Sequence, residues 1–406
     1  MRKYKLKEIS SIYNGSTPST SDVSNYDGDI IWITPKDLSN QKSKYISKGE
    51  RNITEKGYKS CSTTMLPKGT ILLSSRAPIG LLAIAKIELC TNQGFKNIVP
   101  QNEFVDNNYL YYLLSLKIKE IEALGSGTTF KEVSKTSLEN YEINIHDIAE
   151  QQKIANTLNV IDDKIALNNK INNELEQIAK TLYEYWFVQF DFPDEKGRPY
   201  KSANGKMVYN EVLKREIPDG WEVKNIFDVL DIQYGYPFNT ELFTGNKGYS
   251  VVRIRDILTN SISAHTVEKA DGKYKLHEGD LLIGMDGNFH MNYWNETGAY
   301  LNQRCVRIRC KKGTPLSVIQ AKYSLEPFIK KREQNISRTT VGHLSDKDFK
   351  SQYILVPKIN PYFNPKKAFE CILYKITNNN NEIKKLVSLR DFLLPLLMNG
   401  QVSVQC

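Results

Sequence analysis

Two long segments of the chain carry apolar residues at alternating spacings of four and three, which is the pattern of a helix with one buried seam. The first segment, from about Ala149 to Gln189, contains no glycine or proline and predicts a helix of about 40 residues, or ~60 Å. Its seam consists of Ile154, Leu158, Ile161, Ile165, Asn168, Asn172, Leu175, Ala179, Leu182 and Trp186. The second seam consists of Ile372, Ile376, Asn379, Ile383, Leu386, Arg390, Leu393 and Leu397, with Pro395 near its end.

Elsewhere the apolar runs are shorter and are divided by turn residues. Strand-like runs occupy Asp29–Ile33, Thr70–Leu73 and Leu81–Ile87, and a helical stretch covers Asn107–Leu124. This mixture predicts a globular domain of the mixed α/β (α+β) class. Residues 191–220 are rich in proline, glycine and charge without a sustained period, which leaves open a linker or an ordered crossing loop.

The same motifs occur twice, about 210 positions apart. LPKGTILLS (66–74) and NQGFKNI (92–98) return as LHEGDLLIG (276–284) and NQRCVRI (302–308), and SGTTFKEVS (126–134) returns as SRTTVGHLS (337–345). Because the period is about half the chain, each copy is a whole domain. The expected order is a first globular domain at 1–147, a long helix at 148–190, a linker at 191–217, a second globular domain at 218–362 and a C-terminal long helix at 363–406.

Two heptad helices in one chain most simply pack against one another. An antiparallel coiled coil would relate the two domains by a pseudo-twofold axis and hold them at opposite ends of a rod. Asn168, Asn172 and Asn379 would then set the register at some cost in stability. The alternative is that each helix packs on its own domain.

Composition narrows the class of protein. The chain is 40% hydrophobic and 25% charged, and it has no apolar run near the roughly 18 residues of a membrane span, so we expect a folded cytoplasmic protein. The six cysteines show neither a CxxC pair nor zinc spacing with histidine, so we expect reduced, structural thiols and no metal. A formal charge of +9 favours a polyanionic partner without establishing one.

Over essentially its whole length the chain resembles the specificity subunit of type I restriction-modification systems. The resemblance rests on the duplication, on GDLLIGMDGNF (279–289) followed by LNQRCVRI (301–308), and on TTVGHLS (339–345). The segments DFPDEKGRPYKS (191–202), IPDGWEV (217–223) and EQQKIANTLNVIDDKI (150–165) are also typical of that family.

The resemblance implies that each domain reads one half of an asymmetric, bipartite site in double-stranded DNA. It also implies that the helices set the spacing and dock two modification (methyltransferase) subunits, with restriction/translocase subunits joining through the complex. Such a subunit has no catalytic residues or cofactor of its own, since S-adenosylmethionine, ATP and magnesium bind to its partners.

The chain departs from the family pattern in three places. Many relatives have a proline-containing lead where this chain reads YEINIHDIAEQ (141–151), and the EQ pair is missing before the second long helix. The first domain has LLSSRAPIG (72–80) where the second has GMDGNF (284–289). These departures affect the expected shapes of local loops.

Base reading and phosphate binding require Arg, Lys, Asn or hydroxyl side chains on loops or strand ends. The candidates in the first domain are Lys36, Arg76, Lys96, Thr128, Thr129 and Lys131. Those in the second are Arg253, Arg255, Asn288, Arg304, Arg338, Thr339, Thr340 and His343. Any one cation could equally be a solvated surface charge. The GMDGNF segment could be a structural hairpin or a DNA contact, and the paired Asn-Gln turns (92–93, 302–303) favour a role in holding backbone.

Two other classes of function are less consistent with the motifs. A nuclease or methyltransferase acting alone would need donor or metal motifs, and the chain has no P-loop, no NPPF or DPPY tetrapeptide and no clustered histidines. A coiled-coil scaffold that binds only protein would show no salt-dependent affinity for DNA.

Overall fold

The computed structural model describes residues 1–39, 41, 43–126, 131–287, 289–334 and 342–404. The chain forms two compact units, of which unit 1 comprises Met1–Leu167 with Lys384–Cys406 and unit 2 comprises Asn168–Ile383. The part of unit 1 that precedes the first long helix is called the first domain here. The part of unit 2 between the two long helices, beyond the crossing segment, is called the second domain.

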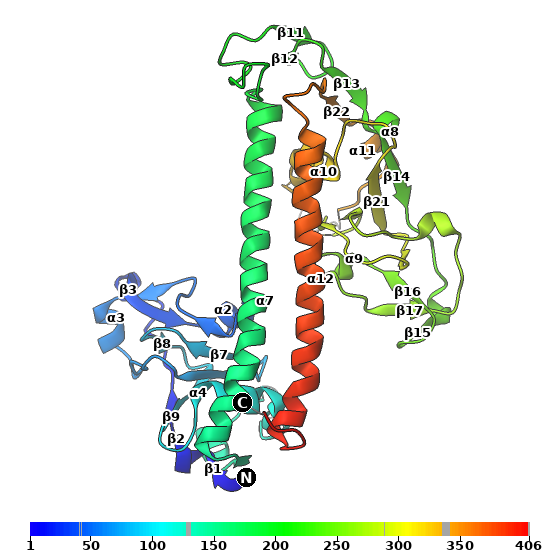
Figure 1. Ribbon diagram of the computed structural model, residues 1–406. Coiled ribbons are helices and arrows are strands. Elements are labelled where there is room, and N and C mark those ends of the chain that lie inside the picture. The colour runs from blue at the N-terminus through cyan, green and yellow to red at the C-terminus, as the bar shows by residue number, and fades with distance from the viewer. Residues whose placement is uncertain (40, 42, 127–130, 288, 335–341, 405–406) are drawn as a thin grey trace. The chain divides into compact units, whose positions relative to one another are not determined.

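The long helices are α7 (Ile148–Tyr183), which is extended by a π-helical turn at Glu184–Val188, and α12 (Pro365–Met398). Within unit 1, Asp162 of α7 pairs with Arg390 of α12. Within unit 2, Asn168 of α7 contacts Glu382 of α12. Asn172 of α7 also contacts Asn380 of α12 within unit 2, so positions on α12 fall as those on α7 rise, which confirms the predicted antiparallel pairing of two heptad helices (Figure 1).

The seam of α7 is buried as its period predicts. Ile154 and Leu158 are fully covered in unit 1 and Ala179 is fully covered in unit 2. The helices also pack on the domains, because Ile154 and Leu158 belong to the same apolar core as Ile71 and Ile98 of the first domain. Pairing between helices and packing on a domain, which the sequence posed as alternatives, are both present.

The first domain consists of small sheets joined by short helices. Its strand orders are β2-β9-β6-β7-β4, β5-β3-β8 and β1-β10. The strands are β1 (Arg2–Lys5), β2 (Ser10–Asn14), β3 (Tyr26–Ile33), β4 (Tyr45–Ile46), β5 (Asn52–Ile53), β6 (Ile71–Ser74), β7 (Leu82–Ala85), β8 (Cys90–Thr91), β9 (Phe95–Pro100) and β10 (Glu142–Ile145). The helices are α1 (Leu6–Ile9), the 3-10 turn η1 (Val23–Asn25), α2 (Pro35–Ser39), α3 (Glu55–Lys59), α4 (Asn107–Leu116), α5 (Ile118–Ala123) and α6 (Lys135–Glu139).

The second domain repeats this plan. Its strand orders are β14-β21-β18-β19, β15-β17-β16-β20 and β13-β22. The strands are β13 (Glu222–Asn225), β14 (Leu230–Tyr234), β15 (Phe243–Thr244), β16 (Tyr249–Val252), β17 (Ala264–Thr266), β18 (Leu281–Gly284), β19 (Met291–Tyr293), β20 (Tyr300–Leu301), β21 (Cys305–Cys310) and β22 (Tyr353–Val356). The helices are α8 (Ile226–Val229), η3 (Thr240–Leu242), α9 (Ile254–Ile257), η4 (Gly272–Tyr274), α10 (Val318–Gln334) and α11 (Asp346–Lys350).

The repeat extends to the register of strand pairs. The pair β3 and β8 is parallel, with Trp32 opposite Cys90, and the pair β16 and β20 is parallel, with Val251 opposite Tyr300. In both domains an antiparallel pair joins the first strand to the last one, β1 to β10 and β13 to β22. Both domains therefore place the ends of equivalent strands at equivalent points.

Residues 191–220 form an ordered crossing segment. It contains an antiparallel hairpin of β11 (Met207–Asn210) and β12 (Arg215–Pro218). Phe192 stacks on Trp221 and on Phe363 with ring centroids 4.9 and 4.6 Å apart. Aromatic packing of this kind fixes the segment against the start of the second domain.

Each domain is also tied to α7 by a tyrosine at the same place in the repeat. In unit 1 the Tyr112 hydroxyl donates to Asp162 at 2.5 Å, and Arg390 pairs with the other oxygen of that carboxylate at 3.0 Å. In unit 2 the Tyr323 hydroxyl donates to Glu176 at 2.9 Å, and Lys322 pairs with the same group at 2.8 Å.

Among the described helices, none is long and apolar enough to cross a membrane.

Candidate nucleic-acid interface

Each domain brings three separate segments together through the same two backbone hydrogen bonds. In the first domain the Ser75 amide donates to the carbonyl of Gly94 at 2.7 Å, and the Val133 amide donates to the carbonyl of Ser75 at 3.0 Å. In the second domain the Met285 amide donates to the carbonyl of Arg304 at 2.9 Å, and the Leu344 amide donates to the carbonyl of Met285 at 2.8 Å. We call residues 75–76, 94–96 and 132–133 the first junction, and residues 285–286, 304–306 and 343–344 the second junction.

The Asn-Gln turn that leads into each junction is held by a glycine. A Cβ added to Gly15 would lie 1.9 Å from the carbonyl oxygen of Asn92, and a Cβ added to Gly235 would lie 1.9 Å from that of Asn302. The Asn92 side chain accepts from the amide of Gly94 at 2.9 Å. These contacts favour the expected role of the turns in holding backbone over a role in reading bases.

A short helix follows the parallel strand in each domain and carries an exposed cation. The carboxylate of Asp37 accepts from the Thr34 amide at 2.7 Å, and that of Asp256 accepts from the Arg253 amide at 2.9 Å. Because these caps fix the first turns of α2 and α9, Lys36 and Arg255 occupy equivalent, exposed positions. Lys36 also pairs with Glu50 at 2.6 Å, and both of those side chains are largely exposed.

One carboxylate organises the charges at each junction. In the first junction Glu132 pairs with Arg76 and with Lys96, both at 3.0 Å. Burial raises the pKa of the Glu132 carboxyl, but the hydrogen bond from Lys96 and the charges of Lys96 and Arg76 lower it by more, so this pKa lies below its ordinary range. Glu132 is therefore ionised at neutral pH.

In the second junction the carboxylate is Asp286. It pairs with His343 at 2.6 Å and with Arg304 at 3.2 Å. His343 stands where Glu132 stands in the repeat, and Asp286 stands where Arg76 stands. The two junctions thus share a backbone frame, but the carboxylate stands at a different position of the repeat in each.

The predicted DNA-binding residues fall into three groups. Exposed side chains on or next to the strand ends are Lys36, Arg76, Lys131, Arg255, Arg304 and His343. Two candidates are held inward instead: the Lys96 side chain is 7% exposed, and the Arg253 guanidinium donates to the backbone and hydroxyl oxygens of Ser263 at 3.0 and 2.8 Å. The predictions at Thr128, Thr129, Asn288, Arg338, Thr339 and Thr340 lie outside the described residues.

The GMDGNF segment connects the antiparallel strands β18 and β19. Gly287 within it has φ +69°, a conformation that favours glycine, and the Phe289 side chain is buried. The side-chain amide of Asn292 donates to the carbonyl oxygens of Ile257 and Leu258 at the end of α9. These contacts favour the structural hairpin, from which Asp286 reaches the second junction.

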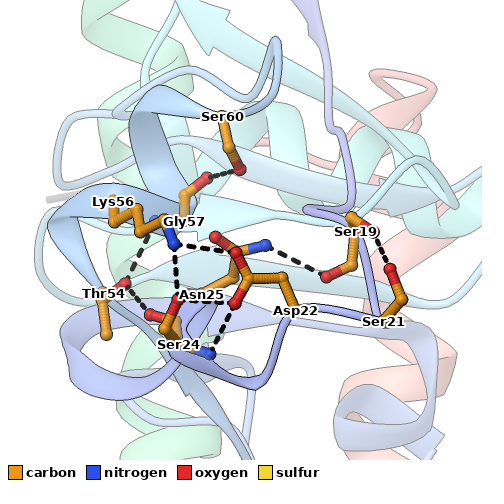
Figure 2. A network of polar contacts seen from close by, with 9 residues as sticks. All are labelled: Ser19, Ser21, Asp22, Ser24, Asn25, Thr54, Lys56, Gly57 and Ser60. Carbon is orange, nitrogen blue, oxygen red and sulfur yellow. Dashed lines mark hydrogen bonds and ion pairs between the residues drawn. The ribbon is translucent and has the colours of Figure 1, made fainter.

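A polar network that the sequence did not single out holds the loop before β3. Lys56 donates to Asp22 and to Ser24 at 2.8 and 2.7 Å, and Thr54 donates to the Ser24 carbonyl at 2.8 Å (Figure 2). The hydrogen bond from Lys56, with those from Ser24, lowers the pKa of Asp22 to about 2. The same loop reaches the first Asn-Gln turn, because the Thr17 hydroxyl donates to Gln93.

Within the described part of the chain, no group of three or more His, Cys, Asp and Glu side chains could hold a metal ion. Cys61, Cys90, Cys305, Cys310 and Cys371 are free thiols. Burial raises the pKa of Cys90 to about 11 and that of Cys305 to about 12, which keeps both of these thiols protonated and unreactive near neutral pH.

Two domains of one plan and an antiparallel helix pair, with exposed basic side chains such as Lys36 and Arg255 at equivalent positions of the two domains, define a duplicated recognition protein. The family model described as "Type I restriction modification DNA specificity domain" matches residues 1–177 and again 218–386. The MjaIX specificity subunit of a type I restriction enzyme from Methanocaldococcus jannaschii is 37% identical, over 99% of this chain and 93% of that protein. The HindI specificity subunit of a type I restriction enzyme from Haemophilus influenzae is 23% identical, over 76% of this chain and 80% of that protein.

Among solved structures, the S subunit of a type I restriction-modification system from M. genitalium aligns with a TM-score of 0.56 at 17% identity, covering 98% of this chain and 95% of that chain. That likeness supports the fold. The chain belongs to the type I restriction-modification specificity family, as its motifs predicted, and it is a DNA specificity subunit. Specificity subunits are the non-catalytic subunits of their complexes.

Proposed function

We propose that each domain of this subunit reads one half of an asymmetric, bipartite site in double-stranded DNA. The observation that carries the proposal is the repeated junction. The same backbone hydrogen bonds occur in both domains, while the exposed side chains on or next to them differ: Arg76 and the adjacent Lys131 in one, Arg304 and His343 in the other. A common frame with unlike side chains suits two readers that approach the duplex alike and select different bases.

Other exposed cations have the properties of phosphate contacts. Lys36 and Arg255 stand at equivalent positions, so they would meet the DNA backbone at equivalent points of the two half-sites. The net charge of +9 adds a general attraction. Such contacts position each domain on the duplex without selecting sequence.

The long helices are proposed to set the gap between half-sites and to dock two modification subunits. In unit 1, Val160 and Leu167 of α7 and Leu389 and Phe392 of α12 are apolar yet exposed. In unit 2 the exposed apolar residues of the helices include Ile178, Tyr185 and Tyr374. Apolar side chains left open on both helices in each unit support one docking surface per unit.

The asparagines of the seam support a fixed register for this spacer. Asn172 donates to Asn380 at 2.7 Å and accepts from Asn379 at 2.9 Å, while Asn168 donates to Glu382 at 2.8 Å. These bonds form together only in one alignment of the helices.

We further propose that restriction/translocase subunits join through the modification subunits, and that S-adenosylmethionine, ATP and magnesium bind to those partners.

Methylation profiling of DNA from cells that carry this chain with its modification subunit tests the proposal. The expected result is one asymmetric motif of two specified segments around a fixed unspecified gap. A continuous or palindromic motif would contradict it. Methyl transfer by the isolated chain would point instead to a catalytic protein, and binding without any dependence on sequence or salt would point to a scaffold.

A further inference from the structure

Arg76 and Arg304 share an arrangement that suits recognition of guanine. In the first junction the Nε of Arg76 donates to Oε2 of Glu132 at 3.0 Å, and in the second the Nε of Arg304 lies 3.2 Å from Oδ2 of Asp286. Both arginine side chains remain about half exposed, at 50% and 55%. Each guanidinium is therefore anchored at its inner nitrogen while its outer part stays open.

The free edge is the one that guanine requires. Among the residues that the structure describes, no protein acceptor contacts the terminal Nη1 or Nη2 atoms of either arginine. Those two nitrogens match the O6 and N7 acceptors that guanine presents in the major groove. A guanidinium that is already oriented by a carboxylate loses less freedom when it binds than a free side chain would.

The two arginine–carboxylate pairs come from different positions of the repeat. In the first domain Arg76 lies on the loop after β6, and its partner Glu132 lies on the segment that follows α5. In the second domain the carboxylate residue, Asp286, lies on the loop after β18, and Arg304 precedes β21. A Cβ on Gly94, the counterpart of Arg304, would lie 2.9 Å from Pro35 in the first domain. The first domain therefore has no room for an arginine where the second has one.

We propose, building on the bipartite reading above, that Arg76 and Arg304 each read a guanine, one in each half-site. Glu132 and Asp286 are the positioning residues that hold the two guanidinium groups. Because the arginines project from different segments of a common frame, the two guanines occupy different places within their half-sites. This offset is a physical source of the asymmetry of the target.

The first test profiles methylation by the complex of this chain with its modification subunit. Arg76→Lys keeps the charge but removes the two-pronged contact, so the motif should lose its guanine requirement at one position of one half-site. Arg304→Lys should do the same in the other half-site only. If the unaltered complex yields no bipartite motif, the proposed function itself fails. If it yields one and both variants retain the full motif, the assignment of the arginines fails alone.

The second test measures binding of the complex to duplexes in which 7-deazaguanine replaces each guanine and so removes its N7 acceptor. The unaltered complex should lose about tenfold or more in affinity at one guanine per half-site. With Arg76→Lys or Arg304→Lys the penalty at the corresponding guanine should disappear. Equal penalties with and without the substitution would overturn the proposal, even for a variant that no longer supports methylation.

Glu132→Gln and Asp286→Asn test the positioning role. Each should reduce discrimination at the guanine of its own domain, whereas a carboxylate that only stabilises the fold would lower affinity for all duplexes alike. Lys36→Ala and Arg255→Ala are the matched controls for that uniform loss. If Glu132→Gln unfolds the domain because Lys96 is left unpaired, the double variant Lys96→Val and Glu132→Gln replaces it, since Val306 is the counterpart of Lys96 in the second domain.

Discussion

At the scale of residues, the burial of a basic side chain decides whether it can bind a ligand. Lys96 and Arg76 share Glu132, but Lys96 is buried while half of Arg76 is exposed. A buried charge needs its partner to remain in the fold, whereas an exposed one can exchange solvent for a ligand. Sequence reasoning named both residues as DNA contacts because local sequence does not reveal the depth of a side chain.

The pKa of Asp22 offers a direct check of the loop network in the first domain. That pKa is about 2 against an ordinary 3.8, chiefly through the hydrogen bond from Lys56. Since it is depressed in the fold, its contribution to stability is present above pH 3.8 and is lost as the pH falls through 2. Lys56→Met should raise the Asp22 pKa toward 3.8, as measured by carboxyl carbon NMR. An unchanged value would show that Lys56 does not hold this loop.

At the scale of elements, the helices that the sequence predicted correctly are those whose hydrophobic heptad pattern continues over many turns. The heptad seams could be read from the sequence because each seam residue reports the same face of its helix, and the seam residues of both helices are buried or partly buried. The stretch Asn107–Leu124 was expected as one helix but breaks at Lys117, where φ is −98° and ψ is 7°. No glycine or proline marks that break, so nothing in the local sequence predicts it.

The seam asparagines give a prediction about the helix pair. Asn172→Ala would leave Asn379 and Asn380 without their partner in a mostly covered layer, and should lower the apparent free energy of unfolding in urea by about 1–3 kcal/mol. Asn378→Ala, on the exposed side of α12, should change it by about 0.5 kcal/mol or less. Equal effects of the two substitutions would show that the bonds across the seam contribute nothing.

The glycines beneath the Asn-Gln turns provide a prediction that is the same in both domains. Gly15→Ala and Gly235→Ala each force a Cβ into a carbonyl oxygen 1.9 Å away, and each should destabilise the protein by about 1–3 kcal/mol. Gly245→Ala, with nothing within 4 Å of its Cβ, is the control and should have little effect. Thermal unfolding followed by circular dichroism measures all three. A mild effect at only one of the two turns would mean that the repeated frame differs between domains.

At the scale of the whole molecule, the repeat accounts both for what could be predicted and for what could not. Matching strings such as LPKGTILLS and LHEGDLLIG established two domains of one plan. The side-chain pairs of the junctions join residues far apart in sequence: Arg76 pairs with Glu132, and Asp286 pairs with His343. An alignment of the two copies places Arg76 against Asp286 and Glu132 against His343, so these positions look unrelated in sequence. In the structure, Arg76 contacts Glu132 and Asp286 contacts His343 across the same backbone frame.

The salt dependence of DNA binding tests whether the two domains hold the duplex in equivalent ways. Each phosphate contact releases counterions, so the slope of log affinity against log salt should decrease in magnitude by about 1 with Lys36→Ala and by about the same amount with Arg255→Ala. The two together should reduce it by about 2, because the residues lie in separate domains. Lys214→Ala, an exposed lysine between β11 and β12, should leave the slope unchanged. An unaltered slope combined with relaxed selection at one base pair would instead make Lys36 or Arg255 a reader of bases, and the equivalence of the domains would then extend to recognition itself.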